Sequence, residues 1–256
     1  MNPRPSGKIL FSFFAGILFF FIFGSFGFAL SDSEIAAYQK SLRGKPVGER
    51  IALWAERFVG TPYDEDPQGL YVTRAVIVAD EKMDCMYLTF RSVELALSAD
   101  PEEAVQIALD KRFQTRGRIQ HGWVLNYEDR YQYGEDMVAS GKWGKEITAG
   151  LGSPKRIEGT RGRNHWQILP AKAFAGRLNR LKSGDLVFFI KDPKKRTVGE
   201  SVGHIGIVKF EEKAGKKSVY LIHAGGSKNK GGAVRKVLLK DYLVKMPFIG
   251  VQVTRF

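Results

Sequence analysis

Cysteine is nearly absent from this chain: Cys85 is the only one among 256 residues. One cysteine can form neither an internal disulfide nor a cysteine cluster that binds zinc. The four histidines do not include the His-x-x-x-His spacing that places two metal ligands on one helix face. A metal hydrolase is therefore the weakest of the functions considered, because it would also leave Cys85 without a role.

Acidic residues are the second shortage. The chain has 27 Asp and Glu against 40 Lys and Arg, a formal net charge of +13. A field of this sign favours an acidic partner, such as a cell-wall polymer, anionic lipid head groups or nucleic acid. Repeats and coiled-coil heptads are also lacking, while the 44% hydrophobic content suffices for a substantial core.

The N-terminus has the pattern of an export signal. Two basic residues precede an almost unbroken apolar run from Ile9 to Phe26, and the small residues Gly27 and Ala29 follow. We predict a signal peptide over residues 1–29. An uncleaved membrane anchor is the alternative, because the run is just long enough to span a bilayer. No cysteine lies near the cleavage site, which excludes a lipoprotein anchor.

Export has consequences for partners and for the thiol. It predicts a location in the periplasm or cell envelope of a bacterium, with membrane contact only through an uncleaved N-terminal segment. It disfavours nucleic acid as the partner of the basic surface. A free thiol is unusual in an oxidising compartment, so its presence there suggests a functional reason for Cys85.

The rest of the chain predicts a linker or N-terminal extension over residues 30–48 and a single domain over residues 49–256. Helical spacing of apolar residues predicts a helix over residues 49–59. An acidic cap followed by proline predicts another from Asp100 to about Lys111. Residues 69–79 are rich in Val, Ile and Tyr and predict a strand.

The second half predicts a sheet. Residues 113–168 show little periodicity, and a segment of this length in a compact protein more often has a function than not. A short basic helix is expected over residues 171–181. Further strands are predicted over residues 186–190, 203–210, 218–224, 234–238 and 248–255, with a helical turn at 239–244. Helices first and an antiparallel sheet second predict an α+β fold.

Cys85 stands where a helix begins. Good helix formers follow it, and Asp84 is a plausible N-cap. A thiol in the first turn feels the positive end of the helix dipole and nearby unpaired N–H groups. Both favour the thiolate, the species that attacks a carbonyl carbon. A buried structural cysteine is the alternative for any lone Cys.

Two histidines lie on strands that are predicted to pair. His204 is in Gly203–Val208, and His223 is in Tyr220–Ala224, on the return strand of one hairpin. Adjoining strands would bring both imidazoles to one sheet face. A thiol activated by one imidazole, whose other nitrogen is held by a second polar group, is the nucleophile–base–orienter arrangement.

Cys85, His204 and His223 belong to three of five short motifs that follow one another along the chain. The motifs are Gly60-Thr61-Pro62-Tyr63, Asp84-Cys85, Ser183-Gly184-Asp185-Leu186-Val187-Phe188-Phe189, Gly203-His204-Ile205-Gly206-Ile207-Val208 and Leu221-Ile222-His223-Ala224. In this order the set resembles the NlpC/P60 superfamily of papain-like cell-wall cysteine peptidases and amidases. The Gly-Thr-Pro-Tyr turn, a long insertion at about 113–168 and Lys240-Asp241-Tyr242-Leu243 before the last strand resemble its DUF1460 branch.

The resemblance implies a papain-like α+β core with the cysteine helix packed on an antiparallel sheet. It implies that Cys85 is the nucleophile, that His204 is base and then acid, and that His223 orients His204, with backbone N–H groups holding the oxyanion and no cofactor. Tyr63 and Asp84 are then expected to line the substrate cleft beside the nucleophile. The DUF1460 branch is associated with N-acetylmuramoyl-L-alanine amidase activity on peptidoglycan fragments.

This chain departs from the family pattern at two places. Members commonly follow Asp-Cys with Thr-Thr-Phe or Ser-Gly, whereas Met86-Tyr87-Leu88 stands here. The branch usually has Arg-Leu-His-Tyr and then Asp-Trp in the insertion, and the best match here is Arg130-Tyr131-Gln132-Tyr133 with Asp136-Met137. We expect Arg130 and Asp136 to shape the substrate cleft, or else to form a surface ion pair. The departures put the substrate in doubt rather than the reaction type.

The sequence thus favours an exported cysteine amidase that cuts peptidoglycan or its fragments. A γ-D-glutamyl–diaminopimelate endopeptidase, the activity of relatives in the wider superfamily, is the first alternative. Recognition of a free N-terminal L-Ala depends there partly on a Ser after Asp-Cys, and Met86 lacks that hydroxyl. A catalytically inactive wall-binding module is the second alternative.

Overall fold

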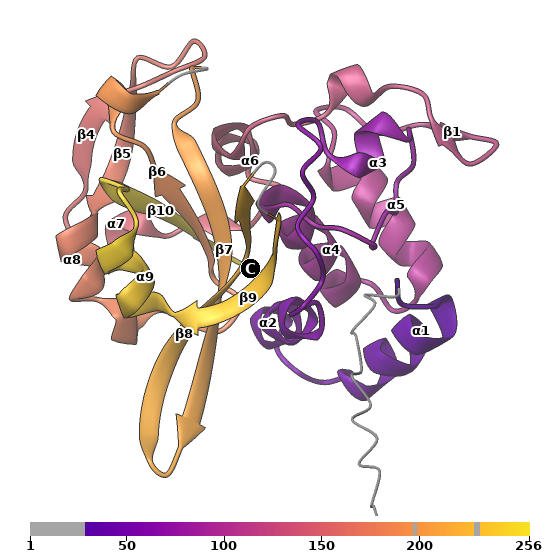
Figure 1. The fold of residues 1–256 in the computed structure, drawn as a ribbon, viewed down its shortest axis with the longest axis horizontal. Coiled ribbons are helices and arrows are strands. Elements are labelled where there is room, and N and C mark those ends of the chain that lie inside the picture. Colours follow the sequence, from indigo (N-terminus) through magenta and orange to yellow (C-terminus); the bar gives the residue numbers. More distant parts are fainter. Residues whose placement is uncertain (1–28, 197–198, 228–230) are drawn as a thin grey trace, which may run out of the picture.

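The computed structural model describes residues 29–196, 199–227 and 231–256. The predicted signal segment lies outside these residues. None of the described helices is long and apolar enough to cross a membrane. Figure 1 shows two halves side by side, a helical half and a sheet half, with the chain running from the first to the second.

The helical half precedes the sheet in the sequence. Its helices are α1 (Asp32–Ser41), α2 (Val47–Arg57), α3 (Leu70–Thr73), α4 (Cys85–Leu97) and α5 (Pro101–Lys111). The connecting region that follows holds β1 (Ile119–Gln120), β2 (Trp123–Val124), η1 (Tyr127–Asp129), α6 (Gly134–Ser140), β3 (Lys145–Glu146) and α7 (Thr148–Leu151).

The sheet half completes the chain. Its strands are β4 (Lys155–Glu158), β5 (His165–Pro170), β6 (Leu186–Ile190), β7 (Val202–Lys213), β8 (Lys216–Ser227), β9 (Gly231–Leu238) and β10 (Gly250–Arg255). The short helices between them are α8 (Ala171–Ala175), η2 (Leu178–Arg180), η3 (Pro193–Lys195) and α9 (Leu239–Lys245).

These strands form one antiparallel sheet in the order β4-β5-β10-β6-β7-β8-β9, and β3 pairs with β10 at its end. The α+β prediction is confirmed. The strand predicted over residues 186–190 matches β6, and the predicted hairpin is the long pair β7–β8. β6 is a continuous apolar run because all five of its residues are buried, with neighbours on both faces of the sheet.

The sheet separates two apolar cores. One core fills the space between the sheet and the helical half, where α2 and α4 contact β7 and β8. The other lies on the opposite face under α8 and α9. Alternation along each strand sends neighbouring side chains to different cores. Ile207 therefore packs toward the helices, while Val208 packs toward α9.

The strand predicted over residues 69–79 is wrong. The segment forms the single turn α3 and then an irregular stretch, in which Gly69 and Ala75 take positive φ angles of 88° and 52°. A backbone hydrogen bond of 2.7 Å from the Val124 N–H of β2 reaches the Ala75 carbonyl, but the segment itself is not a strand, and its buried Tyr71 ring packs against Tyr87 and Tyr127. β-propensity describes a fit to a sheet surface, so this context overrides it.

The helix predictions around α4 are confirmed. Asp84 caps α4 by accepting from the backbone N–H of Tyr87 at 2.6 Å, and Asp100 caps α5 in the same way. The stretch 30–48 contains α1, whose Ile35 belongs to the core between helices and sheet. A capping box at Ser31 begins that helix.

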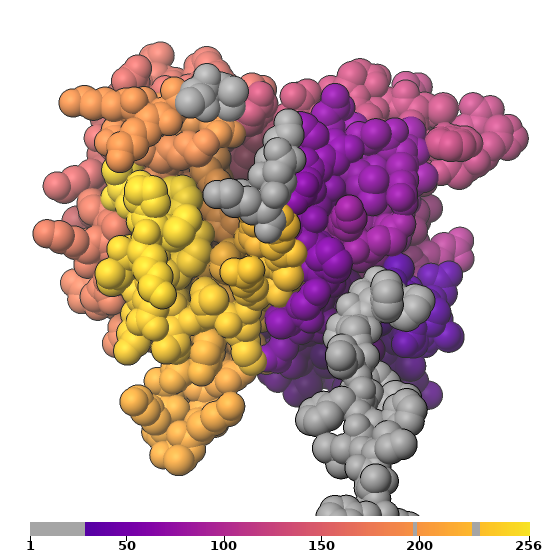
Figure 2. All heavy atoms as spheres, viewed as in Figure 1, coloured from indigo at the N-terminus to yellow at the C-terminus, as the bar shows by residue number. Residues whose placement is uncertain are grey.

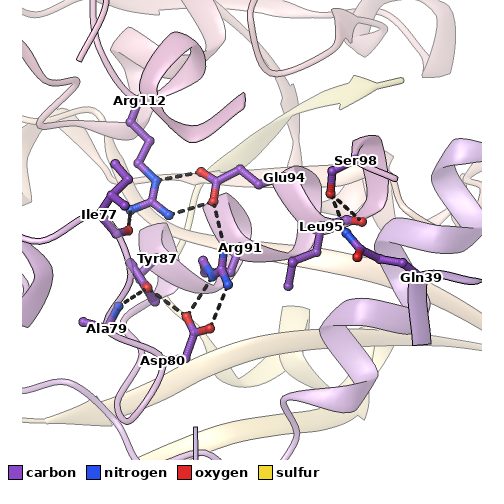
Figure 3. A network of polar contacts seen from close by, with 10 residues as sticks. All are labelled: Gln39, Ile77, Ala79, Asp80, Tyr87, Arg91, Glu94, Leu95, Ser98 and Arg112. Carbon is purple, nitrogen blue, oxygen red and sulfur yellow. Dashed lines mark hydrogen bonds and ion pairs between the residues drawn. The ribbon is translucent and has the colours of Figure 1, made fainter. Parts of the chain in front are cut away.

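A buried ionic network ties α4 to the chain that leads into it (Figure 3). Arg91 of α4 makes two hydrogen bonds of 2.8 Å to Asp80, and Glu94 of α4 makes bonds of 2.6 and 2.7 Å to Arg112. Arg112 also donates to the Ile77 carbonyl at 2.8 Å. The side chains in the two ion pairs are at most 3% exposed. The network therefore holds residues 77–80, a few positions before Cys85, against the middle of α4.

Removing one member of this network should destabilise the fold strongly. Glu94→Ala leaves the fully buried Arg112 guanidinium without its carboxylate, and we expect a loss of about 3–5 kcal/mol in unfolding free energy. Urea denaturation gives the measurement. The control is Glu49→Ala, which removes the exposed Lys45–Glu49 pair and should cost about 0–1 kcal/mol. Equal losses in the two variants would contradict this account.

Candidate active site

Cys85 is the first residue of α4 and remains partly accessible to solvent. Its backbone N–H is one of the helix-start groups that has no partner inside the helix. The backbone N–H of Ile205 on β7 is one of the groups that oppose the rise of the Cys85 pKa, and α4 contacts β7. The end of the cysteine helix therefore meets the strand that carries His204.

His204 and His223 lie together, as the predicted hairpin requires. The distance between His204 Nε2 and His223 Nδ1 is 2.9 Å, and the two rings meet edge to face with centroids 5.0 Å apart. One of these nitrogens must donate and the other accept. If His204 Nε2–H donates, the His204 Nδ1 nitrogen is free to accept a proton from another group.

The close packing of these rings requires a glycine on β8. A Cβ placed at Gly225 would lie 2.8 Å from Cε1 and 3.2 Å from Nδ1 of the His223 ring. Real Cβ atoms do not approach that closely, so a side chain at this position would push the ring away from His204.

Tyr242 is a site residue that sequence reasoning did not assign. This α9 residue is 8% exposed, and its ring packs on both imidazoles, with centroids 6.0 Å from His204 and 4.8 Å from His223. Burial raises the pKa of its hydroxyl, and the nearby Cys85 contributes to the rise. The signal was present as the Lys240–Leu243 motif before the last strand, which carried no chemical role by itself.

Tyr63 lies close to the same group. Its backbone N–H donates to the Gly232 carbonyl at 2.9 Å, and its ring covers Gly226 near the end of β8. Burial raises the Tyr63 pKa to about 12, with Cys85 as the next cause. Tyr63 and the N-cap Asp84 are therefore the two expected substrate residues that the structure brings next to Cys85.

Arg130 and Asp136 do not pair with each other. Arg130 follows η1 and donates to the Tyr127 carbonyl at 2.8 Å. Asp136 of α6 pairs with Arg161 at 3.4 Å and with Arg163 at 3.3 Å. Asp136, Arg161 and Arg163 line a polar pocket of about 310 Å³ between α6 and the loop from β4 to β5, and Arg130 is not among its lining residues. No described contact joins either expected residue to Cys85 or to the histidines.

The electrostatics of the site differ from the sequence expectation. Burial raises the pKa of the Cys85 thiol to about 12, and the Asp84 charge adds to the rise. Burial lowers the pKa of His204 to about 3, with His223 as the second cause. The helix start was expected to favour the thiolate, but the helix-end dipole acts as only about half a charge, and desolvation outweighs it here. Both the thiol and the imidazole are therefore neutral in the resting protein.

Two neighbouring groups respond to the same burial. Desolvation raises the pKa of Asp84 to about 6, although the backbone N–H of Tyr87 opposes the rise. Desolvation lowers the pKa of His223 to about 4, and the charge of Arg235 adds to the effect. Within the described part of the chain, no group of three or more His, Cys, Asp or Glu could hold a metal ion.

Known proteins resemble this chain in three-dimensional structure, whereas no match is found by sequence. The sequence matches no family model and no curated protein. A Bacteroides uniformis structure named as an N-acetylmuramoyl-L-alanine amidase is 18% identical, with a TM-score of 0.61 over 82% of this chain and 98% of its own. A Legionella pneumophila protein of DUF1460 is 14% identical, with a TM-score of 0.68 over 87% of this chain and 93% of its own. The chain shares their fold.

Sequence identities this low show that the fold is shared, but they do not show that the reaction is shared. A Bacteroides fragilis structure with a TM-score of 0.60 and 18% identity, covering 80% of this chain and 100% of its own, carries a provisional xylanase name. One fold can host different reactions, so the site residues must decide between them.

The raised thiol pKa predicts slow alkylation of the folded protein. At pH 7 the thiolate fraction should be on the order of a thousandfold lower than for an ordinary cysteine, and the iodoacetamide rate should climb steadily as the pH rises from 6 to 10. Intact-mass kinetics give the rate. The same chain in guanidinium chloride is the matched control, because Cys85 is its only thiol. Rapid modification at pH 6 with little pH dependence would indicate a thiolate and refute the prediction.

Gly225→Ala should separate the two imidazoles. The new methyl group displaces the His223 ring and lengthens its 2.9 Å contact with His204, at a stability cost of about 1–3 kcal/mol for overpacking. Imidazole proton–nitrogen NMR spectra report the contact, and thermal unfolding reports the fold. Gly150→Ala is the control, since its Cβ would meet no atom within 4 Å. Unchanged imidazole signals in the Gly225 variant would refute the steric argument.

Proposed function

We propose that this protein is an exported cysteine hydrolase that cleaves an amide bond of peptidoglycan or its fragments, as an N-acetylmuramoyl-L-alanine amidase. One observation carries the proposal: Cys85 begins the helix that contacts β7, the strand of His204, and His204 Nε2 lies 2.9 Å from His223 Nδ1. These are the parts of a nucleophile–base–orienter group.

The first half of the reaction forms a thioester. His204 Nδ1 takes the proton of the Cys85 thiol as the sulfur attacks the amide carbonyl carbon. The negative charge on the carbonyl oxygen faces the N-terminal end of α4, where the Cys85 N–H is free to donate. His204 then gives the proton to the leaving amine, the C–N bond breaks, and the acyl group remains on sulfur.

The second half returns the enzyme to its starting state. Water enters, His204 removes one of its protons, and the oxygen attacks the thioester carbonyl. The C–S bond breaks, the proton returns to Cys85, and the product carboxylic acid leaves. His223 holds the tautomer of His204 throughout and stabilises the imidazolium that forms in each half. A neutral resting pair fits this cycle, because charge separates only once substrate is bound.

The substrate assignment has separate support. The fold is shared with structures named as N-acetylmuramoyl-L-alanine amidases. The net charge of +13 suits a polymer rich in carboxylates. Met86 stands where endopeptidase relatives use a serine to recognise a free L-Ala amine, which favours cleavage between muramic acid and the stem peptide. The apolar N-terminal run supports export to the compartment where that polymer lies.

Digestion of purified muropeptides followed by mass spectrometry tests the proposal. The protein without residues 1–29 should release free stem peptide from the sugar, and Cys85→Ala should lose at least 10³-fold in kcat/KM because the nucleophile is gone. His204→Ala should lose activity to a similar degree. His121→Asn is the matched control, since His121 is an exposed histidine with φ 52° that asparagine tolerates.

The other outcomes assign the protein elsewhere. Cleavage inside the stem peptide would make it a γ-D-glutamyl–diaminopimelate endopeptidase. Binding of muropeptides without any product would make it an inactive wall-binding module. Full activity of Cys85→Ala would exclude cysteine catalysis.

A further inference from the structure

Arg235 of β9 stands directly across from His223 of β8. The two residues are register partners in the antiparallel pair β8–β9. Side chains of such partners point to the same face of the sheet, with Cβ atoms about 4.5–5.5 Å apart. Arg235 is exposed, and its charge acts on the His223 imidazole. A guanidinium therefore borders the catalytic group from the strand at the edge of the sheet.

Two lysines of the same sheet are paired with glutamates, whereas Arg235 has no acidic partner among the described residues. Lys236, the next residue, bonds Glu56 at 2.6 Å and Glu211, and Lys209 pairs with Glu56 at 3.2 Å. Among residues 29–196, 199–227 and 231–256, no Asp or Glu forms an ion pair or hydrogen bond with Arg235. Figures 1 and 2 place β9 at the front of the sheet half, where that half meets the helical half.

The positive charge of Arg235, without an acidic partner beside His223, opposes the proposed hydrolysis. His204 becomes an imidazolium during catalysis and shares a hydrogen bond with His223. A nearby positive charge raises the energy of that imidazolium. An anion bound to Arg235 would remove the penalty at the moment when substrate is present, so the group is arranged to favour an acidic substrate.

We propose that Arg235 binds a carboxylate of the peptide stem of the substrate, close to the bond that is cut. This inference rests on the proposed function and specifies which substrates the site accepts. His204 and Arg235 lie on β7 and β9, which β8 separates by about 10 Å across the sheet, and an extended peptide spans about 3.3–3.6 Å per residue. A carboxylate two or three residues from the scissile bond is therefore within reach, and a guanidinium can hold it with two hydrogen bonds.

The test compares two muropeptides that differ in one group. One carries a free α-carboxylate on the second stem residue, D-glutamate, and the other carries the amide at that position. The unmodified protein should have a kcat/KM about 10–100-fold higher for the carboxylate, mostly through KM, as is typical for a lost charge-assisted contact. Arg235→Gln should abolish the preference: the rate on the carboxylate substrate should fall, whereas the rate on the amide should not fall, because the variant also lacks the charge that opposes the imidazolium.

Two further variants separate recognition from other effects. Arg235→Lys keeps the charge without the bidentate geometry and should restore part of the preference. Arg177→Gln removes one exposed arginine from the segment after α8, on another flank of the sheet, and should leave the preference intact. Equal loss on both substrates in Arg235→Gln would mean that Arg235 acts only on the histidines, and would overturn the proposal.

A binding measurement keeps the inference separate from the enzyme hypothesis. Calorimetry with Cys85→Ala should show about 10–100-fold tighter binding of the carboxylate muropeptide, and the double variant with Arg235→Gln should lose the difference. Equal affinity for both muropeptides would overturn the role of Arg235, even if hydrolysis is observed. Absence of hydrolysis with a retained Arg235-dependent preference would instead reject only the catalytic proposal.

Discussion

The burial of α4 is the constraint on which the rest of this structure depends. Ten of its thirteen residues are buried, including the charged Arg91 and Glu94. Charges in that position must be paired, and Asp80 and Arg112 pair them. Asp80 comes from the loop before α4 and Arg112 from the residue that follows α5, so α4 holds both segments in place. Its three partly exposed residues are Cys85 and Met86 at its start and Leu97 at its end, so the candidate nucleophile lies at one accessible end of the helix.

The same burial decides the chemistry of the candidate site. Desolvation makes the charged form of both Cys85 and His204 costly, and the dipole of one helix is too weak to compensate. The site therefore rests neutral and separates charge only during a reaction. The surrounding sheet follows the same rule, because Lys209 and Lys236 are neutralised by glutamates. Arg235 departs from it beside His223, and we propose that this departure gives the site a preference for an anion.

Features that depend on neighbours in sequence could be predicted. The Asp84 cap, the strand at residues 186–190 and the pairing of the two histidine strands each follow from spacing over a few residues. The predictions failed where a distant contact decides. Residues 69–79 have a strand-like composition, but the buried Tyr71 packs against rings from α4 and η1 and the segment turns. Tyr242 had no visible role because it lies in α9, whereas the imidazoles it covers lie on β7 and β8.

The sequence by itself determined which groups are available for chemistry and in which local setting: one thiol at a helix start, two histidines on paired strands and an excess of positive charge. The tertiary structure decided their protonation, because a pKa depends on how much water the folded chain excludes. It also decided which lysine and arginine side chains form ion pairs with Asp or Glu. Asp136 is paired with arginines of a distant loop, whereas Arg235 faces His223 without an acidic neighbour among the described residues. Desolvation and long-range pairing are properties of the packed chain, and no local pattern encodes them.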